Sequence, residues 1–353
     1  MTGASMAQGL VCPVPISETE RVLLGHGSGG KLSAALLRDR FLPHLGNATL
    51  EPLGDAALLA VQQGELAVST DSFVVSPIEF PGGNIGSLAV HGSLNDLAMM
   101  GAEPIGLTAG FILEEGLPLD VLDRVVAAMG RAARAAGVSV VTGDTKVVER
   151  GKADRMFINT TGLGMRRLGV TPGPDRARPG DKILVSGPIG RHGMAIMAER
   201  EGIGFESPIE SDSATLWPVV KLLLERVGPA VHALRDPTRG GLASALNEIA
   251  ASSRVGVVLE DGRVPVPGPV AAACEMLGLD PMYVANEGVF TAFIAPDLAD
   301  EALEAVRSHP LGDGAAIIGT ATTEHAGFVI LRTGLGGTRV VDLLPGDQLP
   351  RIC

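Results

Sequence analysis

Cysteine is scarce in this sequence. Only three cysteines occur among 353 residues, at positions 12, 274 and 353. They are too few and too widely spaced to form a disulfide framework or a zinc knuckle. A chain without structural disulfides fits a reducing compartment, so we expect a cytoplasmic protein. Cys274 lies in an apolar helical pattern and is expected in the core. Cys353, the last residue of the sequence, needs another explanation.

Aromatic residues, basic runs and long apolar runs are also missing. Aromatics make up 3% of the chain, and no cluster of Lys and Arg stands out against a net charge of −12. Stacking platforms and basic patches are therefore not expected, and we predict no nucleic-acid partner. No segment reaches the roughly 18 uncharged apolar residues of a membrane span, so no membrane partner is predicted. Residues 1–20 lack the features of a signal peptide and are expected to form a disordered lead-in.

Strand-like runs alternate with amphipathic helical patterns over the rest of the chain, which predicts an α/β (α+β) fold. Asn84 is a plausible cap for a helix that starts at Ile85. A clearer helix has the stripe Leu122, Val125, Val126, Met129 and Ala133, and Gly137 ends it. The Pro- and Gly-rich segment near Pro172 to Gly180 predicts a domain boundary. The expected units are residues 21–172, 178–343 and a tail, 344–353.

A glycine-rich stretch near the start invites a P-loop interpretation. Residues 25–32 read GHGSGGKL and match the spacing G-x-x-x-x-G-K. A P-loop requires Ser or Thr next, but Leu32 occupies that position and Ser33 comes one residue late. A mobile glycine-rich loop with a lysine can still close over phosphates without this motif. A flexible loop without a ligand explains the spacing equally well.

Five acidic residues lie where predicted strands end or helices begin. They are Asp55, Asp71, Asp96, Asp144 and Asp236. Carboxylates repel a triphosphate, but Mg²⁺ bridges the two because it binds carboxylate and phosphate oxygens together. Each residue alone is more often a cap or a turn residue, so the prediction depends on the group. We expect Asp144 at the carboxyl end of a strand, with Thr142 and Lys146 beside it. A solvated lysine on an edge strand is an equal alternative for Lys146.

Two residue types suit proton transfer. Glu287 lies between apolar runs, where partial burial raises a carboxyl pKa and prepares it to carry protons. A capped or ion-paired strand end explains it equally well. His26 and His91 lie near glycine-rich or polar motifs and titrate near neutral pH. Each of them alone is more often a hydrogen-bonded structural residue.

Several motifs together carry a family resemblance. They are HGSGGK, TDSFVVSP, FPGGNIGSLAVHGSLNDLAMMGAEP, FILEEGLP, VTGDTKVVERG, FINTTGLG, RDPTRGGLASALNEIA, LGLDPMYVANEG and the final PRIC. This set resembles the HypE family of hydrogenase maturation proteins over roughly Val22 to Cys353. That family belongs to the aminoimidazole ribonucleotide synthetase-like group of ATP-using enzymes. The resemblance implies a two-domain fold, an N-terminal sheet that pairs across a homodimer, and ATP in the cleft between the domains.

The resemblance also implies a reaction. The cysteine of the tail receives a carbamoyl group from the carbamoyltransferase HypF. ATP then drives dehydration of this S-carboxamide to an S-cyanide. The cyano group passes to iron on a HypC–HypD scaffold and becomes a ligand in nickel–iron hydrogenase.

Roles follow from this chemistry. Phosphorylation turns the amide oxygen into a leaving group, after which a base removes N–H protons. We expect Cys353 to carry the group, with Glu287 as the base and His91 as the second candidate. Asp55, Asp96 and Asp236 are the expected Mg²⁺ ligands, and the number of metal ions stays open. The expected ATP-binding residues are Gly27, Ser28, Gly29, Gly30, Lys31, Asp71, Asn95, Thr142, Gly143, Asp144 and Lys146.

The tail from residue 344 contains Pro345, Gly346 and Pro350, so we expect it to be extended and mobile rather than docked in a core. Ile352 is expected to anchor the tail by apolar contact, and Arg351 to pair with an acidic group or a phosphate. Two other functions fit the sequence. One is a small-molecule kinase or synthetase of the same superfamily. The other is a docking protein that nucleotide switches without catalysis.

Overall fold

The computed structural model describes residues 20–28, 31–51, 53, 57, 59–61, 64–166, 169, 171–203, 208–334, 336–343, 349 and 351–353. Several of the predicted residues lie outside this part of the chain. The lead-in up to residue 19, Gly29, Gly30, Asp55 and residues 344–348 and 350 of the tail lie outside the described residues, as does the side chain of Lys31.

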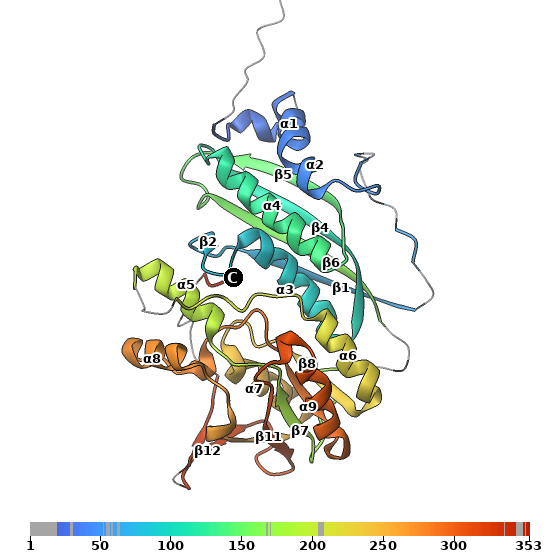
Figure 1. The fold of residues 1–353 in the computed structure, drawn as a ribbon, viewed down its shortest axis with the longest axis vertical. Coiled ribbons are helices and arrows are strands. Elements are labelled where there is room, and N and C mark those ends of the chain that lie inside the picture. The colour runs from blue at the N-terminus through green and yellow to red at the C-terminus, as the bar shows by residue number, and fades with distance from the viewer. Residues whose placement is uncertain are drawn as a thin grey trace, which may run out of the picture.

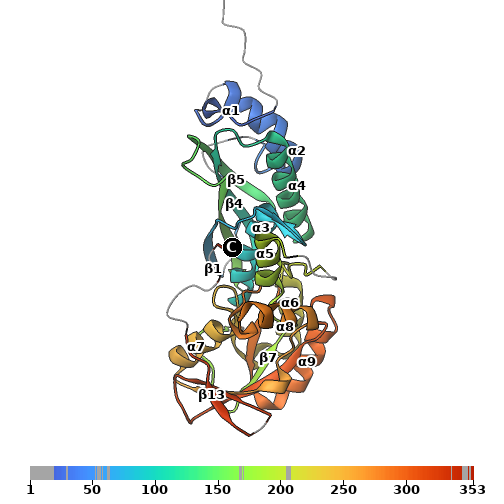
Figure 2. The same ribbon diagram turned by 90° about the vertical axis from the view of Figure 1, so that its left-hand side faces the viewer.

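The N-terminal part is built on a four-stranded sheet with the order β1-β6-β4-β5 (Figure 1). Neighbouring strands are antiparallel except β4 and β5, which are parallel. Helices α3 and α4 cover one face of this sheet (Figure 2). The elements are η1 (Leu24–Gly27), α1 (Lys31–Leu36), η2 (Leu37–Phe41), α2 (Leu42–Leu45), β1 (Glu65–Phe73), β2 (Glu79–Phe80), β3 (Gly83–Asn84), α3 (Ile85–Met99), β4 (Ala102–Glu114), α4 (Leu119–Ala135), β5 (Val140–Val148) and β6 (Met156–Arg166).

Local sequence explains both covering helices. The Asn84 side chain accepts hydrogen bonds from the backbone N–H groups of Gly86 and Ser87 at 2.9 and 3.2 Å, which confirms the predicted cap of α3. The predicted stripe of α4 is buried against the sheet and α3. Gly137 follows α4 with φ +69°, a conformation that favours glycine and ends the helix.

The C-terminal part is built on a seven-stranded sheet with the order β13-β12-β9-β11-β7-β10-β8. Helix α7 covers one face, and α6 and α9 cover the other. Side chains alternate along each strand, so one strand contributes to the cores on both faces. On β7, Ile183 and Val185 pack in the core with α7, and Leu184 packs with α6. The elements are β7 (Lys182–Val185), α5 (Arg191–Glu201), α6 (Trp217–Val227), β8 (Val231–Arg235), α7 (Gly241–Ser253), β9 (Gly256–Glu260), α8 (Gly268–Leu277), β10 (Thr291–Ile294), α9 (Ala299–Arg307), β11 (Ala316–Thr322), β12 (Val329–Arg332) and β13 (Thr338–Val340).

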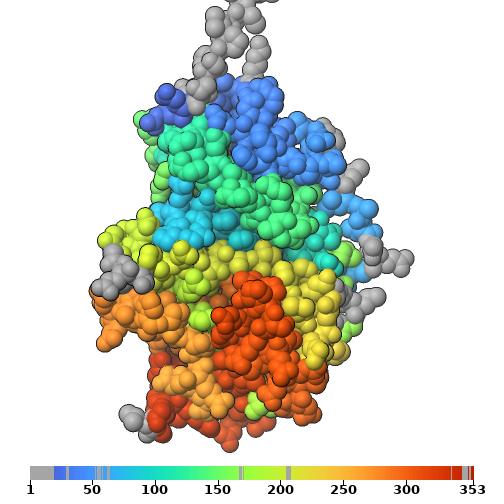
Figure 3. Space-filling view, in the orientation of Figure 1, coloured from blue at the N-terminus to red at the C-terminus, as the bar shows by residue number. Residues whose placement is uncertain are grey.

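The two parts pack directly on each other. The yellow-green surface of α5 and α6 lies between the blue-green N-terminal part and the orange-red C-terminal part (Figure 3). Met194 and Ile196 of α5 belong to the N-terminal core, and Met99 of α3 packs in the core around α6. The junction therefore holds side chains from both parts in fixed positions.

Two expectations about strands are corrected. Asp144 lies in the middle of β5, which continues to Val148, so it is not at the carboxyl end of a strand. The 13-residue strand β4 was not predicted, because Pro104 and two glycines interrupt its strand-like pattern. None of the helices in the described part of the chain is both long and apolar enough to cross a lipid bilayer.

Candidate functional site

Four of the predicted acidic residues come together at the junction of the two parts. Asp71 lies on β1, Asp96 on α3, Asp236 directly after β8 and Glu287 shortly before β10. Burial and the nearby charge of Asp96 raise the pKa of Asp71 to about 6. Burial, followed by the charge of Asp96, raises the pKa of Asp236 to about 7. We call these four residues the acid cluster.

Glu287 is the most buried carboxyl group of the acid cluster, with 3% of its surface exposed. Burial, and then the charges of Asp236 and Asp212, raise its pKa well above the usual value. A raised pKa makes the carboxylate in such a setting a stronger base than an exposed one. Its position therefore suits proton transfer.

His91, the second candidate base, has the opposite shift. Its Nδ1 atom lies 2.8 Å from the Ser213 hydroxyl oxygen, and burial lowers its pKa to about 4. A lowered pKa makes the imidazole a weaker base. The two environments therefore favour Glu287 over His91 for proton removal.

Asp212 was not predicted and belongs beside the acid cluster. Its Oδ1 atom accepts a hydrogen bond from the backbone N–H of Glu287 at 3.1 Å, and burial raises its pKa to about 6. Its Oδ2 atom is buried without a hydrogen-bond partner among the described residues. The local sequence SDSAT reads as an ordinary polar loop, so only the folded chain reveals this carboxyl group.

The donor set fits a divalent cation by its chemistry. Carboxylate oxygens are the ligands that Mg²⁺ prefers, and one of them, Asp212 Oδ2, is buried and unsatisfied. A cation would also offset the burial and the mutual repulsion that together raise the pKa values of Asp71, Asp236 and Glu287. Within the described part of the chain, no three His, Cys, Asp or Glu side chains are already arranged to hold a metal ion. A bound ion would therefore draw part of its coordination from a ligand or from water.

A second group of predicted residues lines a cavity at the other edge of the sheet. Gly27, Thr142, Gly143, Asp144 and Lys146 lie on the wall of a cavity of about 290 Å³, beneath α1 and η2. The Lys146 ammonium pairs with Asp144 Oδ2 at 2.7 Å, and this contact lowers the pKa of Asp144. The remaining wall is largely apolar, from the side chains Leu37, Phe41, Leu45, Leu50, Leu53, Ala109, Phe111 and Val140.

Close backbone approach explains a glycine in this cavity. A Cβ atom on Gly27 would lie 2.5 Å from the backbone nitrogen of Val147, so η1 packs against β5 only without a side chain there. Next to it, the Ser28 hydroxyl donates to the Gly25 carbonyl oxygen at 2.8 Å. The glycine-rich segment is thus held against β5 as far as Ser28.

The Asn95 side chain is engaged in hydrogen bonds with backbone groups. Its amide nitrogen donates to the backbone oxygens of Ala214 and Glu287 at 3.0 and 3.1 Å, and its Oδ1 atom accepts from the Leu216 N–H. These bonds tie α3 to the loop before α6. A role for Asn95 in binding ATP stays a prediction.

The described residues at the end of the chain, 349 and 351–353, dock at the junction, whereas the sequence predicted that they would not dock in a core. Leu349 and Ile352 are 7% and 3% exposed, and Cys353 packs against the same core. The Val74 N–H donates to the Cys353 backbone oxygen and the Ser76 N–H to that of Arg351, both at 3.2 Å. The burial of Ile352 confirms the predicted apolar anchor.

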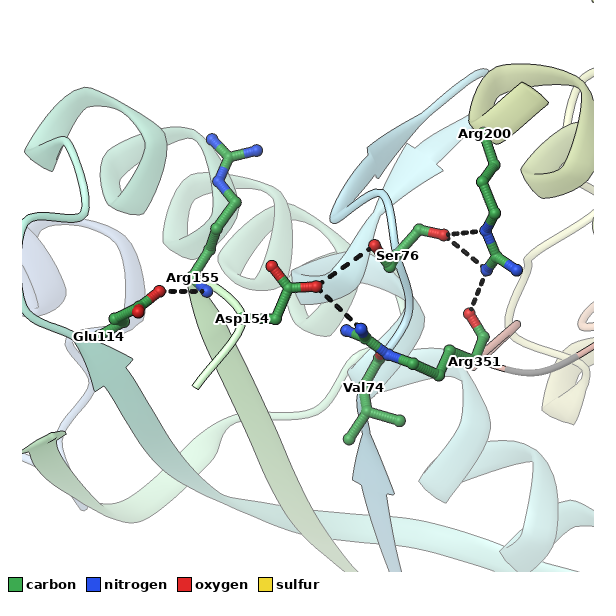
Figure 4. Close-up of polar contacts among 7 residues, drawn as sticks. All are labelled: Val74, Ser76, Glu114, Asp154, Arg155, Arg200 and Arg351. Atoms are coloured by element: carbon green, nitrogen blue, oxygen red, sulfur yellow. Dashed lines mark hydrogen bonds and ion pairs between the residues drawn. The ribbon is translucent and has the colours of Figure 1, made fainter. Parts of the chain in front are cut away.

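Polar side chains complete this binding site for the tail. The Arg351 guanidinium donates to Asp154 Oδ2 at 2.8 Å, which is the predicted pairing with an acidic group. Arg200 donates to the carbonyl oxygens of Ser76 and Arg351 (Figure 4). His192 Nε2 lies 3.0 Å from the Ile352 carbonyl oxygen. We call Val74, Ser76, Asp154, His192 and Arg200 the tail dock.

Comparisons with known proteins agree with this geometry. Residues 53–166 match the family "AIR synthase related protein, N-terminal domain", and residues 178–332 match its C-terminal domain. A relative from Azotobacter vinelandii, "Carbamoyl dehydratase HypE", is 54% identical over 93% of this chain and 96% of its own.

Solved structures give the same result. A crystal structure of the hydrogenase maturation protein HypE in complex with ATP has 52% identity and a TM-score of 0.91, and the match covers 94% of this chain and 99% of that chain. A chain from a HypE–HypF complex has 44% identity and a TM-score of 0.78, with 88% and 100% covered.

Proposed function

Because the chain belongs to the HypE family of carbamoyl dehydratases, which act in hydrogenase maturation, we propose that it dehydrates an S-carboxamide on its own Cys353. The product is an S-cyanide that supplies the cyano ligand of nickel–iron hydrogenase. The observation that carries this proposal is the docked tail. The backbone oxygen of Cys353 accepts a hydrogen bond from the Val74 N–H, and Val74 lies three residues after Asp71 of the acid cluster.

The chemistry needs an activated oxygen and a base. The carboxamide oxygen attacks the terminal phosphorus of ATP, and ADP leaves. The two N–H protons are then removed while the C–O bond breaks, which leaves C≡N on sulfur and releases phosphate. Glu287 takes a proton in this scheme because its raised pKa favours proton transfer to its carboxylate. Its burial also limits the access of water to the reacting atoms.

Metal binding is assigned to the acid cluster. Asp96 and Asp236, with Asp71 and Asp212 beside them, would hold Mg²⁺, and Asp55 is a further candidate outside the described residues. Bound Mg²⁺ would neutralise the phosphate charge that these carboxylates otherwise repel. The raised pKa values of Asp71 and Asp236 support this assignment, since two buried like charges need a cation to ionise together.

ATP binding is assigned to two places in the chain. The cavity under α1 has an apolar wall for a flat ring and a polar rim with Lys146 for phosphate, and the acid cluster would hold the metal. Within one protomer, the cavity under α1 and the acid cluster lie apart. Asp71, Thr160, Ala109 and Gly143 lie in one row across the sheet, and three strand spacings separate its ends by about 14 Å.

A homodimer would bring the two places together, and the open face of the sheet supports it. Leu66 and Val68 on β1 and Ile112 on β4 are 53%, 59% and 43% exposed on the face that α3 and α4 leave uncovered. Asp144 lies in the same row as Ser72, on this open face. The proposed dimer therefore places the Lys146 edge of one protomer beside its partner.

We assign HypF as the carbamoyl donor, because a relative has been solved in a HypE–HypF complex. A HypC–HypD complex as the cyanide acceptor and a cytoplasmic location complete the proposal. A carrier cysteine must leave the tail dock to meet either partner. The side chains of the Arg351–Asp154 ion pair are 40% and 47% exposed, so water screens this pair and it can open at low cost.

One experiment separates the candidate functions. The carbamoylated protein should convert one ATP per Cys353, and Cys353→Ala should bind ATP with unchanged affinity but convert none in this single turnover. If the protein is a small-molecule kinase, its Cys353→Ala variant would still phosphorylate a metabolite. A nucleotide-switched docking protein would show no ATP-dependent change on Cys353. Either result would reject the dehydratase assignment.

A further inference from the structure

The inner half of the tail dock is a buried histidine with a defined hydrogen pattern. His192 is fully buried, and burial lowers its pKa to about 4, so the imidazole is neutral at pH 7. The Ile352 carbonyl oxygen only accepts, so Nε2 must carry the hydrogen and donate across 3.0 Å. Nδ1 then accepts from the Ser211 hydroxyl at 2.8 Å. The Phe80 ring packs edge-on against the imidazole at 5.6 Å and fixes its plane.

The outer half of the tail dock consists of charged groups near solvent. Burial, and then the nearby charge of Arg351, lower the pKa of Arg200, so the two guanidinium groups lie close together. Asp154 accepts from Arg351 and offsets this repulsion (Figure 4). Arg351 also donates from Nε to the Val74 carbonyl oxygen at 3.0 Å. The outer half thus holds two cations together by directed hydrogen bonds and one carboxylate.

The tail adopts a backbone conformation that it would not choose alone. Arg351 has φ +54°, which is unfavourable for a residue with a side chain. Bonds on both sides maintain it, because the Arg351 carbonyl oxygen accepts from the Ser76 N–H and from Arg200. This turn directs Ile352 into the core and sets the direction of Cys353. The tail dock therefore selects one conformation of the chain end.

A short segment connects the tail dock to the acid cluster. Ser211 bonds to His192, Asp212 accepts from the Glu287 N–H, and Ser213 bonds to His91. Three consecutive residues thus contact the tail dock, the candidate base and the second histidine. This segment therefore joins His192 of the tail dock to the backbone of Glu287 through hydrogen bonds.

We propose that the tail dock positions the Cys353 sulfur for dehydration, with His192 as the inner positioning residue and Arg200 and Asp154 as the latch that holds the chain end in place. Each of the three bonds to the backbone or the side chain of residues 351 and 352. This inference rests on the proposed function, which supplies the dehydration step. The docking itself is testable without it.

The first test is the rate at which iodoacetamide alkylates Cys353 in the full-length protein, measured by mass spectrometry of the C-terminal peptide. Opening the tail dock exposes the thiol, so Asp154→Asn and Arg200→Gln should each raise the rate about fivefold or more. Glu260→Gln is the matched control, because it breaks a similarly exposed ion pair with Arg332 far from the tail. It should leave the rate unchanged.

A double variant tests the latch as a pair. Asp154→Asn and Arg351→Gln remove the same bond, so the double variant should be alkylated no faster than the faster single variant. Rates that multiply would show that the two residues act separately and would overturn the latch. Equal rates for wild-type protein and the single variants Asp154→Asn, Arg200→Gln and Arg351→Gln would overturn the tail dock itself.

The second test measures positioning by His192. His192→Gln keeps an N–H donor near Nε2, whereas His192→Leu removes it. In a single turnover of the carbamoylated protein, His192→Leu should slow the loss of water about tenfold or more and leave the KM for ATP within about twofold. His192→Gln should recover most of the rate. A leucine variant as fast as wild type would overturn the positioning role.

The two tests fail separately. If wild-type carbamoylated protein never loses water, the proposed function is wrong, and alkylation still decides whether the tail dock holds Cys353. If wild type loses water and no variant changes the rate of alkylation or of water loss, the proposed function stands and the positioning inference is wrong. Arg200 and Asp154 are both partly exposed, so Arg200→Gln and Asp154→Asn keep the test decisive if His192→Leu does not fold.

Discussion

His192 Nε2 lies 3.0 Å from the carbonyl oxygen of Ile352, although 160 residues separate them in the sequence. The contact joins the first turn of α5 to the residue before Cys353. It fixes the end of a chain whose sequence predicts mobility. A carrier cysteine thus has a defined seat at the junction where the acid cluster lies.

The environments of Glu287 and His91 predict different effects of substitution. Glu287→Gln should lower the dehydration rate by about 10²–10⁴-fold, the usual contribution of a general base, with ATP affinity unchanged. His91→Gln should cost less than about tenfold, because burial has already weakened that imidazole as a base. Single-turnover rates of the two carbamoylated variants measure this. A larger loss for His91→Gln would reverse the assignment.

Asp236 predicts a dependence of stability on pH. Its pKa is about 7 in the folded chain and has a usual value of 3.8, so the folded state binds the proton more tightly. The stabilisation is present at low pH and is lost as the pH rises from about 4 through 7. The Tm of wild type relative to Asp236→Asn should therefore fall by roughly a few degrees between about pH 5 and 8.

Magnesium provides the control for that measurement. A cation among the carboxylates should restore the Tm of wild type at the higher pH and have a smaller effect on Asp236→Asn. Adding the same buffer without Mg²⁺ should change the Tm of neither protein. A difference in Tm that is constant across the pH range would show that Asp236 ionises normally in the folded protein.

Lys146 predicts an effect on nucleotide binding. It is the exposed cation on the rim of the cavity under α1, where a phosphate would replace Asp144 as its partner. Lys146→Gln should raise the KM for ATP about tenfold, and the effect should shrink at high salt. Lys221→Gln on α6 is a suitable control. Equal KM values for both variants would remove Lys146 from the ATP site.

The open sheet face predicts a disruptive substitution. Val68→Lys places a charge in the proposed interface and should convert a dimer to a monomer, as measured by light scattering after gel filtration. Val340→Lys on β13 changes a residue of similar exposure, 54% against 59%, and should have no effect. A wild-type monomer at micromolar concentration would contradict the homodimer.

Local patterns were sufficient for the elements that fold by local rules. The apolar stripe of α4 and the cap at Asn84 are read within one or two helical turns, and both are confirmed. The strand β4 is stabilised by its two neighbours in the sheet, so its glycines and Pro104 misled a local interpretation. Tertiary context outweighs local propensity in such strands.

The site residues that residue type alone identifies could be predicted from the sequence. Those that depend on contacts between residues far apart in the sequence could not. Asp71, Asp96, Asp236 and Glu287 were predicted from their chemistry, and the fold brings them together. Asp212 carries no local signal. The docked tail depends on partners more than 150 residues away, and Pro350 and Gly346 describe only the free chain.

The central claim is that the sulfur of Cys353 carries the group that ATP dehydrates. Mass spectrometry of the C-terminal peptide, before and after ATP is added to protein carbamoylated by its donor system, tests it most directly. The account predicts a carboxamide on Cys353 that loses one water, about 18 Da, only when ATP and Mg²⁺ are present. A carboxamide that stays unchanged, or a cyanide made by protein lacking Cys353, would contradict it.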